Sequence, residues 1–182
     1  MPYNYFRYWT YERARTRRPK KGSEIQEYVT ILKTHLYEKY SPILDVGCGE
    51  GWYVRLFSSS CGVDINLNRL KHAKNLGTIV AQGNLLELPF PDKIFEASYT
   101  MQVLMHIPNH LIMQALKELL RVTQKKILHI EAYRKKKRKM TAHCFNHDLE
   151  SLYCKLGTEM VYSKRLKTYK TQVCSIFAPE GK

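Results

Sequence analysis

The feature that most constrains this chain is a short apolar run that ends in an acid and is followed by alternate glycines, Ile43-Leu44-Asp45-Val46-Gly47-Cys48-Gly49-Glu50-Gly51. The apolar run predicts a buried strand, and the glycines predict a tight turn that opens a helix. Glycine permits positive φ angles and a close approach of ligand to backbone, and a helix start supplies unpaired N–H groups. Three alternate glycines exceed what an ordinary strand–turn–helix corner needs. The stretch therefore indicates a site for a nucleotide-like ligand.

The spacing of these glycines favours one kind of nucleotide site over another. The dinucleotide fingerprint is G-x-G-x-x-G, and its third glycine, counted from Gly47, falls on Trp52. The pattern found is G-x-G-x-G after an acid, which resembles the first motif of class I S-adenosylmethionine-dependent methyltransferases. The resemblance implies S-adenosylmethionine as the cofactor. A nicotinamide oxidoreductase is the alternative, and Trp52 argues against it. In the first motif the implied cofactor contacts are Asp45, Gly47, Cys48, Gly49 and Gly51.

Two later segments have the order that the resemblance requires. Residues 61–65 read as a second strand ending at Asp64, where an acid can accept hydrogen bonds from both ribose hydroxyls. The alternative role for Asp64 is a helix N-cap, and both roles can hold together. Residues 79–85 resemble the adenine-contacting segment of the family, with Asn84 where Asp is common. The remaining implied cofactor contacts are Ile65, Leu85, Met101 and Gln102.

The resemblance extends over residues 43–130. Leu88-Pro89-Phe90-Pro91-Asp92 and Gln102-Val103-Leu104-Met105-His106-Ile107-Pro108 resemble segments before and after the fourth strand, and Glu96 stands where the family usually has Asp. The implied fold class is α/β and Rossmann-like: a seven-stranded, mostly parallel sheet with a final antiparallel hairpin and helices on both faces. We expect one domain over residues 1–182, with an aromatic and basic segment and a helix in residues 1–40 and the core in residues 41–182.

Hydrophobic periodicity places the expected elements along the chain. It predicts helices at residues 23–39, 52–58, 66–75, 108–123 and 148–156. It predicts strands at residues 43–46, 61–65, 94–99, 126–130, 159–166 and 171–178, and a third strand with its turn at residues 79–85. Gln124-Lys125-Lys126 replaces the Pro-Gly-Gly turn common in the family, so we expect a tighter or differently shaped connection before the fifth strand.

Charge points toward a polyanionic partner. The net charge is +14, which simple solubility would also explain. The basic residues cluster in three places: residues 13–21 behind an aromatic run, the block Arg134-Lys135-Lys136-Lys137-Arg138-Lys139, and residues 164–170. Aromatic side chains beside arginines suit base stacking and phosphate contact. We therefore expect an RNA acceptor, especially tRNA, and the motif pattern also resembles that of small tRNA wobble-modifying methyltransferases. The alternative interpretations are an N-terminal segment packed on the core and a solvated loop at residues 134–139.

His106 is the candidate catalytic residue, either as a base or as a contact to the acceptor. Its alternative role is to bridge the fourth strand and the next helix. Other acceptors remain open: a small molecule or a protein side chain. The non-enzymatic alternative is a protein that binds S-adenosylmethionine and supports a partner methyltransferase. Tyr99-Thr100-Met101-Gln102 stands where amino-methylating DNA enzymes carry Pro-Pro, which disfavours that class.

The remaining features indicate a protein of the cytoplasm without a metal site. Five cysteines without regular spacing favour reduced thiols. His143, Cys144, His147 and Cys154 do not match a zinc spacing, so we expect ordinary packing there. No apolar run reaches the length of a membrane span, and residues 1–7 lack an apolar signal-peptide core.

Overall fold

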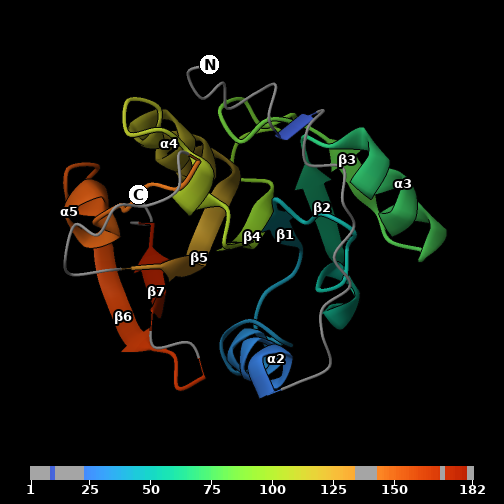
Figure 1. The fold of residues 1–182 in the computed structure, drawn as a ribbon, viewed down its shortest axis with the longest axis horizontal. Helices are drawn as coiled ribbons and strands as arrows, with labels where there is room; N and C mark the ends of the chain where they lie inside the picture. Colours follow the sequence, from blue (N-terminus) through green and yellow to red (C-terminus); the bar gives the residue numbers. More distant parts are fainter. Residues whose placement is uncertain (1–8, 11–22, 134–142, 169–170, 180–182) are drawn as a thin grey trace.

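The computed structural model describes residues 9–10, 23–133, 143–168 and 171–179 (Figure 1). Seven strands form one sheet in the order β3-β2-β1-β4-β5-β7-β6. The strands are β1 (Ile43–Val46), β2 (Ser60–Asp64), β3 (Val80–Gln82), β4 (Phe95–Met101), β5 (Thr123–Ala132), β6 (Glu159–Arg165) and β7 (Gln172–Ala178). The helical elements are α2 (Ser23–His35), η2 (Val54–Leu56), α3 (Leu67–Asn75), η3 (Leu104–His106), α4 (Ile112–Val122) and α5 (Leu149–Cys154).

The sheet is mostly parallel and has one antiparallel strand, β7. β1 pairs in parallel with β2 on one side and β4 on the other, so the chain reverses direction across the sheet beside β1. β7 runs antiparallel to both β5 and β6. The expected fold class is confirmed, and so is the switch point next to residues 43–46, where open α/β sheets bind their ligands.

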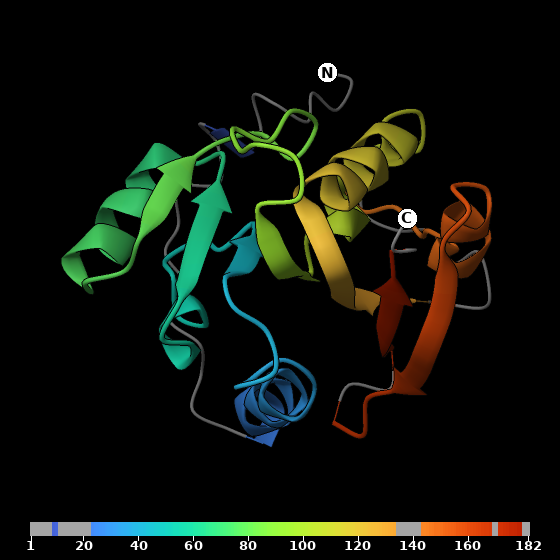
Figure 2. The same cartoon turned by 180° about the vertical axis from the view of Figure 1, so that it is seen from behind.

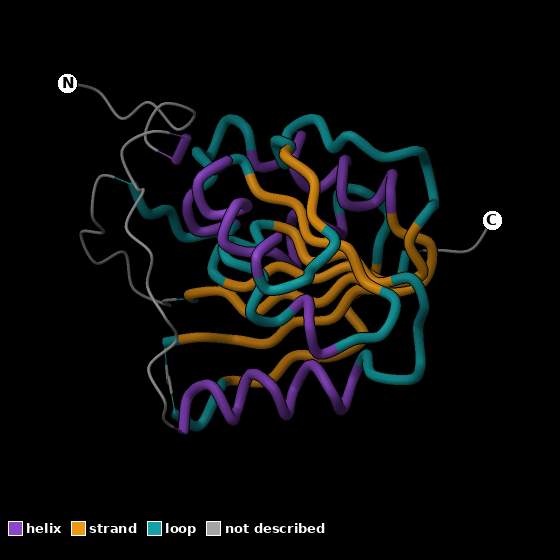
Figure 3. Tube along the Cα trace, turned by 90° about the vertical axis from the view of Figure 1, so that its right-hand side faces the viewer, coloured by secondary structure: helices purple, strands orange, loops and turns teal. Residues whose placement is uncertain are grey.

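The sheet is covered on both faces by separate hydrophobic clusters. On β1, Ile43 packs with Tyr28 and Leu32 of α2, whereas Leu44 packs with Leu116 of α4. This alternation is the period of two that a strand imposes on its side chains. In Figure 3 the long helix α2 lies below the sheet. α3 lies beside the β3 edge and α5 beside the β6 edge (Figures 1 and 2).

The prediction of a helix at residues 52–58 is wrong. Only the single 3-10 turn η2 forms, because Gly51 still has φ +73° and Phe57 is already extended, with φ −122° and ψ 139°. Residues 52–59 must also bring the chain back to the start of β2, which leaves room for one turn. The glycine stretch therefore opens no full helix.

Smaller differences concern the ends of elements. α4 is shorter than the predicted helix at residues 108–123, and β4 and β5 are longer than predicted. β5 begins at Thr123 directly after α4 ends at Val122, so Gln124-Lys125-Lys126 belongs to the strand and forms no turn. Within the described part of the chain, no helix has both the length and the apolar character needed to cross a membrane.

Candidate functional site

The glycine stretch follows β1 at the switch point, and its glycines are required for different structural reasons. Gly47, Gly49 and Gly51 all have positive φ angles. A Cβ on Gly47 would lie 2.4 Å from Cγ2 of Val103, and one on Gly51 would lie 3.0 Å from Cβ of Ala73. Gly47 therefore allows the chain after β4 to lie against the loop, whereas Gly51 allows α3 to pack behind it.

The Asp64 carboxylate ties this loop to the turn after β2. Its Oδ2 accepts the Gly49 N–H at 2.8 Å, and its Oδ1 accepts the Asn66 N–H at 2.8 Å. Burial raises the pKa of Asp64, and the two backbone hydrogen bonds oppose that rise. The N-cap of α3 is Asn66, whose Oδ1 accepts the N–H groups of Asn68 and Arg69. Asn66, and not Asp64, is therefore the residue that caps α3.

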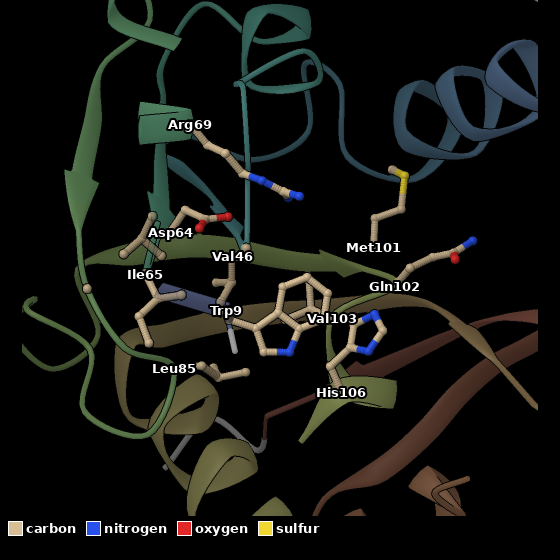
Figure 4. Close-up of a pocket in the computed structure, with 13 residues that line it drawn as sticks. Trp9, Val46, Asp64, Ile65, Arg69, Leu85, Met101, Gln102, Val103 and His106 are labelled. Carbon is tan, nitrogen blue, oxygen red and sulfur yellow. The ribbon is translucent and has the colours of Figure 1, made fainter. Parts of the chain in front are cut away.

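A cavity of about 330 Å³ opens at this edge of the sheet (Figure 4). It is lined by seven residues that the sequence had singled out: Gly47, Asp64, Ile65, Leu85, Met101, Gln102 and His106. Trp9 also lines it and belongs to the aromatic run before residues 13–21, for which the sequence predicted base stacking. The sequence had not singled out the other five: Val46, Val63, Arg69, Gly83 and Val103. Val46 and Val103 adjoin singled-out residues, whereas Arg69 carries no such local signal.

The other expected contacts lie behind the cavity wall. Asp45 is 3% exposed, and burial, with the nearby charge of Asp64, raises its pKa to about 7. Cys48 packs so close to the backbone of β2 that a Cβ on Gly62 would lie 2.6 Å from its Sγ. The Asn84 Oδ1 accepts the Leu86 N–H at 3.0 Å, so that oxygen holds the turn after β3.

A second buried acid, Glu131 near the end of β5, holds the chain segment after β4. Its Oε1 accepts the N–H groups of Val103 and Leu104 at 3.0 and 3.1 Å, and its Oε2 accepts that of Met105 at 3.3 Å. Burial raises the pKa of Glu131, and these hydrogen bonds oppose the rise. The residue just before them, Gln102, has φ +56°, a strained conformation that needs such support. The sequence signal for Glu131 was an acid inside the apolar run of β5.

Glu131 also ends a buried chain of side-chain hydrogen bonds. The Thr100 hydroxyl donates to Glu131 Oε1 at 2.8 Å, so its oxygen must accept from His129 Nδ1 at 2.7 Å. His129 Nε2 is then the acceptor for the Tyr153 hydroxyl at 2.8 Å. Burial lowers the pKa of His129 to about 3, which keeps the ring neutral and fixes this tautomer.

His106 lies on η3 and faces the cavity. Its Nδ1 is 2.9 Å from the carbonyl oxygen of His143. Because a carbonyl only accepts, Nδ1 carries the proton, and Nε2 of the neutral ring carries the lone pair. The Trp9 ring packs against it with centroids 4.3 Å apart. His106 thus has the tautomer that a base or acceptor contact at Nε2 requires.

The His and Cys residues of 143–154 serve separate structural contacts. Cys144 Sγ lies 3.8 Å from His106 Nδ1, buried His147 donates from Nε2 to the Ile107 carbonyl at 2.9 Å, and Cys154 is exposed. Across the described residues, no three His, Cys, Asp or Glu side chains gather into a metal-binding group.

Comparison with known proteins agrees with this geometry. Residues 44–128 match the family model described as a methyltransferase domain. Residues 44–128 are thus similar to a methyltransferase domain. An uncharacterized protein of Methanocaldococcus jannaschii, MJ0638, is 34% identical over 103 residues, which are 56% of this chain and 44% of that protein. The chain thus spans less than half the length of that curated relative.

Solved structures share the fold of this chain. The PH0226 protein of Pyrococcus horikoshii OT3 aligns with a TM-score of 0.74 and 17% identity over 96% of both chains. Magnesium protoporphyrin IX methyltransferase of Synechocystis PCC 6803, with bound S-adenosylhomocysteine, aligns at 0.68 and 14% identity over 86% of this chain and 82% of that one. A chain from a Haloferax volcanii complex with the Trm112 methyltransferase activator aligns at 0.72 and 12% identity, over 97% and 98%.

The buried Asp45 makes the stability of the folded chain depend on pH. The folded chain keeps the Asp45 proton up to about pH 7, whereas the unfolded chain loses it near 3.8. The folded state binds more protons between these values, so stability falls as pH rises through this window. Asp45→Asn should remove this term. In urea unfolding, the variant should gain about 2–3 kcal/mol relative to wild type between pH 5 and 8. In the exposed control Asp92→Asn, the free energy of unfolding relative to wild type should not change between pH 5 and 8. An equal gain in both variants would show that Asp45 is not the source of the pH dependence.

Glu131→Gln should loosen the segment after β4, because an amide group replaces one oxygen that now accepts backbone N–H groups. We expect a loss of about 1–3 kcal/mol in urea unfolding. Hydrogen exchange should become faster at the amides of Val103, Leu104 and Met105. Glu159→Gln, on the exposed side of β6, should change neither quantity. Unchanged exchange at those three amides in Glu131→Gln would show that another group holds them.

Proposed function

We propose that this chain is an S-adenosylmethionine-dependent methyltransferase. The observation that carries the proposal is the position of the Asp64 carboxylate, which lies in one cavity with Gly47 and is bonded to Gly49 of the same loop. A carboxylate beside a glycine loop suits the two hydroxyls of a ribose. Ile65 and Leu85 give the same cavity apolar walls, which suit the faces of an adenine ring.

These residues are less suited to bind a nicotinamide dinucleotide, the alternative cofactor. A pyrophosphate is normally held by the N-terminus of a full helix after the glycine loop. Only the three-residue turn η2 follows here, and Trp52 occupies the position of the third glycine. A cofactor without phosphate therefore fits better.

The side chains of the site divide the work of methyl transfer among them. The cofactor supplies a methyl group on a sulfonium centre, and the protein binds, orients and excludes water. Asp64 binds the cofactor ribose. Gln102 and Val103 shape the wall opposite the glycine loop, and Glu131 holds Val103 in place. His106 Nε2 accepts a proton or a hydrogen bond from an acceptor whose nucleophile must lose its proton.

We infer that the acceptor is RNA, with tRNA the leading class. The described part of the third basic cluster, at the end of β6, supports this. In the sheet register, Lys164 of β6 lies opposite Cys174 of β7, which lies opposite Ile130 of β5. Arg165 lies opposite Val173, which lies opposite Glu131. These two cations thus lie at the edge where β5 ends, two strands or about 10 Å from Glu131. Phosphates of a strand entering the cavity would pass within reach. Residues 13–21 and 134–139 lie outside the described residues, and their role in RNA binding stays part of the proposal.

One alternative is that the acceptor is a small molecule or a protein side chain. The other is that the chain is a non-catalytic subunit that binds S-adenosylmethionine. The protoporphyrin methyltransferase favours the first, and the Trm112 complex favours a protein partner. All five cysteines are free thiols, which supports a reducing compartment such as the cytoplasm.

The cofactor proposal predicts a specific loss in Gly47→Ala. The new Cβ would collide with Val103, so S-adenosylhomocysteine should bind about 10-fold or more weakly by calorimetry. The matched control is Gly77→Ala, because Gly77 also has positive φ but has no atom within 4 Å of the new Cβ. Both variants incur about 1–2 kcal/mol of backbone strain, and only the first should lose the ligand. Wild type that binds NAD and not S-adenosylhomocysteine would refute the proposal.

The acceptor proposal predicts a salt-dependent contact at the end of β6. Lys164→Gln with Arg165→Gln should weaken RNA binding and flatten the plot of log affinity against log salt by about 0.7 per lost phosphate contact. Lys71→Gln with Lys74→Gln removes the same charge from exposed positions of α3 and should leave the slope unchanged. Labelled methyl transfer to RNA, protein extract and metabolites then identifies the acceptor class. Label only in protein or metabolites would replace RNA with the alternative.

A further inference from the structure

Trp9 is held in the cavity wall by a residue far along the chain. The Asn66 Nδ2 donates to the Trp9 carbonyl oxygen at 2.9 Å across 57 positions of sequence. Asn66 is 2% exposed, and its Oδ1 caps α3 at the same time. Its own N–H donates to Asp64. One buried amide thus links the position of Trp9 to the acid proposed to hold the ribose.

The Trp9 ring packs against His106 in a tilted arrangement. Their centroids are 4.3 Å apart with planes at 49°, and His143 is stacked on His106 at 5.8 Å and 25°. In the close-up, the Trp9 indole projects into the cavity between Leu85 and His106 (Figure 4). The indole therefore offers a flat apolar face beside the imidazole of His106, whose neutral ring accepts hydrogen bonds at Nε2.

We propose that Trp9 and His106 form the subsite for the acceptor group and that this subsite takes one planar heteroaromatic ring, an unpaired nucleobase. The ring stacks on the indole and donates an N–H to His106 Nε2. An aliphatic acceptor would use neither the flat face nor the nitrogen, whereas a base uses both. This inference rests on the proposed function, because it places the base beside the residues that would bind the cofactor.

Asn66 is a positioning residue in this arrangement, and its two roles can be separated. Asn66→Ser keeps an oxygen to cap α3 but loses the amide N–H that reaches Trp9. Asn66→Ala loses both. If the amide positions Trp9 for the acceptor, Asn66→Ser should weaken base binding with a smaller loss of thermal stability than Asn66→Ala.

The two tryptophans of the chain allow a direct test. Trp52 lies outside the cavity lining, with its Nε1 donating to Glu50, so Trp52→Phe leaves Trp9 as the single fluorescent reporter. With saturating S-adenosylhomocysteine, short unstructured oligoribonucleotides should quench it saturably. Trp9→Phe, which leaves Trp52 as the reporter, should show no saturable quenching. Absence of saturable quenching in Trp52→Phe would overturn the proposal.

Further variants separate this inference from the proposed function. Trp9→Leu should weaken oligoribonucleotide binding about 10- to 100-fold, the loss expected for one stacked base, and should leave S-adenosylhomocysteine affinity within about 3-fold of wild type. Equal loss of both ligands, or full quenching of Trp9 by S-adenosylhomocysteine alone, would assign Trp9 to the cofactor wall and refute the subsite. Wild type that binds no S-adenosylhomocysteine refutes the proposed function, while the quenching measurement still decides whether bases bind Trp9.

Discussion

The hydrogen bonds that the Asp64 carboxylate accepts hold the site together. One oxygen takes the N–H of Gly49 and the other that of Asn66, so a single side chain fixes the loop after β1 against the turn after β2. A buried carboxylate is costly unless such donors satisfy it. Through Asn66 the same anchor reaches the N-cap of α3 and the carbonyl of Trp9. The cavity wall on this side therefore depends on one acid.

Glu131 has the corresponding role on the other side of the switch point. Asp64 ends β2 and Glu131 lies near the end of β5, so the two acids flank the central strands β1 and β4. The carboxylate oxygens of each acid accept hydrogen bonds from backbone N–H groups of a neighbouring segment. The two anchored segments meet where Gly47 faces Val103, at a distance that leaves no room for a side chain on Gly47. The cavity is thus bounded by two rigid loops, and this rigidity favours a bound molecule of defined shape.

The carboxyl edge of the sheet also brings together features that are far apart in sequence. The cavity, the Trp9 and His106 pair, and the end of β6 with Lys164 and Arg165 all lie along it. A polyanion that follows this edge would place its phosphates near the cations and one base near the aromatic pair. The proposed cofactor site and the proposed phosphate contacts thus share one edge of the sheet.

The sequence by itself determined the order of the elements and much of the cavity lining, including Gly47, Asp64, Ile65, Leu85 and His106. It could do so because those residues follow strands, and parallel strands end at the same edge of a sheet. The tertiary structure alone decided the rest. It reduced the helix at residues 52–58 to one turn and left Cys48, Gly51 and Asn84 out of the cavity lining. It also placed Trp9 of the aromatic run in the cavity wall and added Arg69 and Glu131. These outcomes depend on burial and on hydrogen bonds between distant residues, such as Asn66 to Trp9, and hydrophobic periodicity carries no record of such pairs.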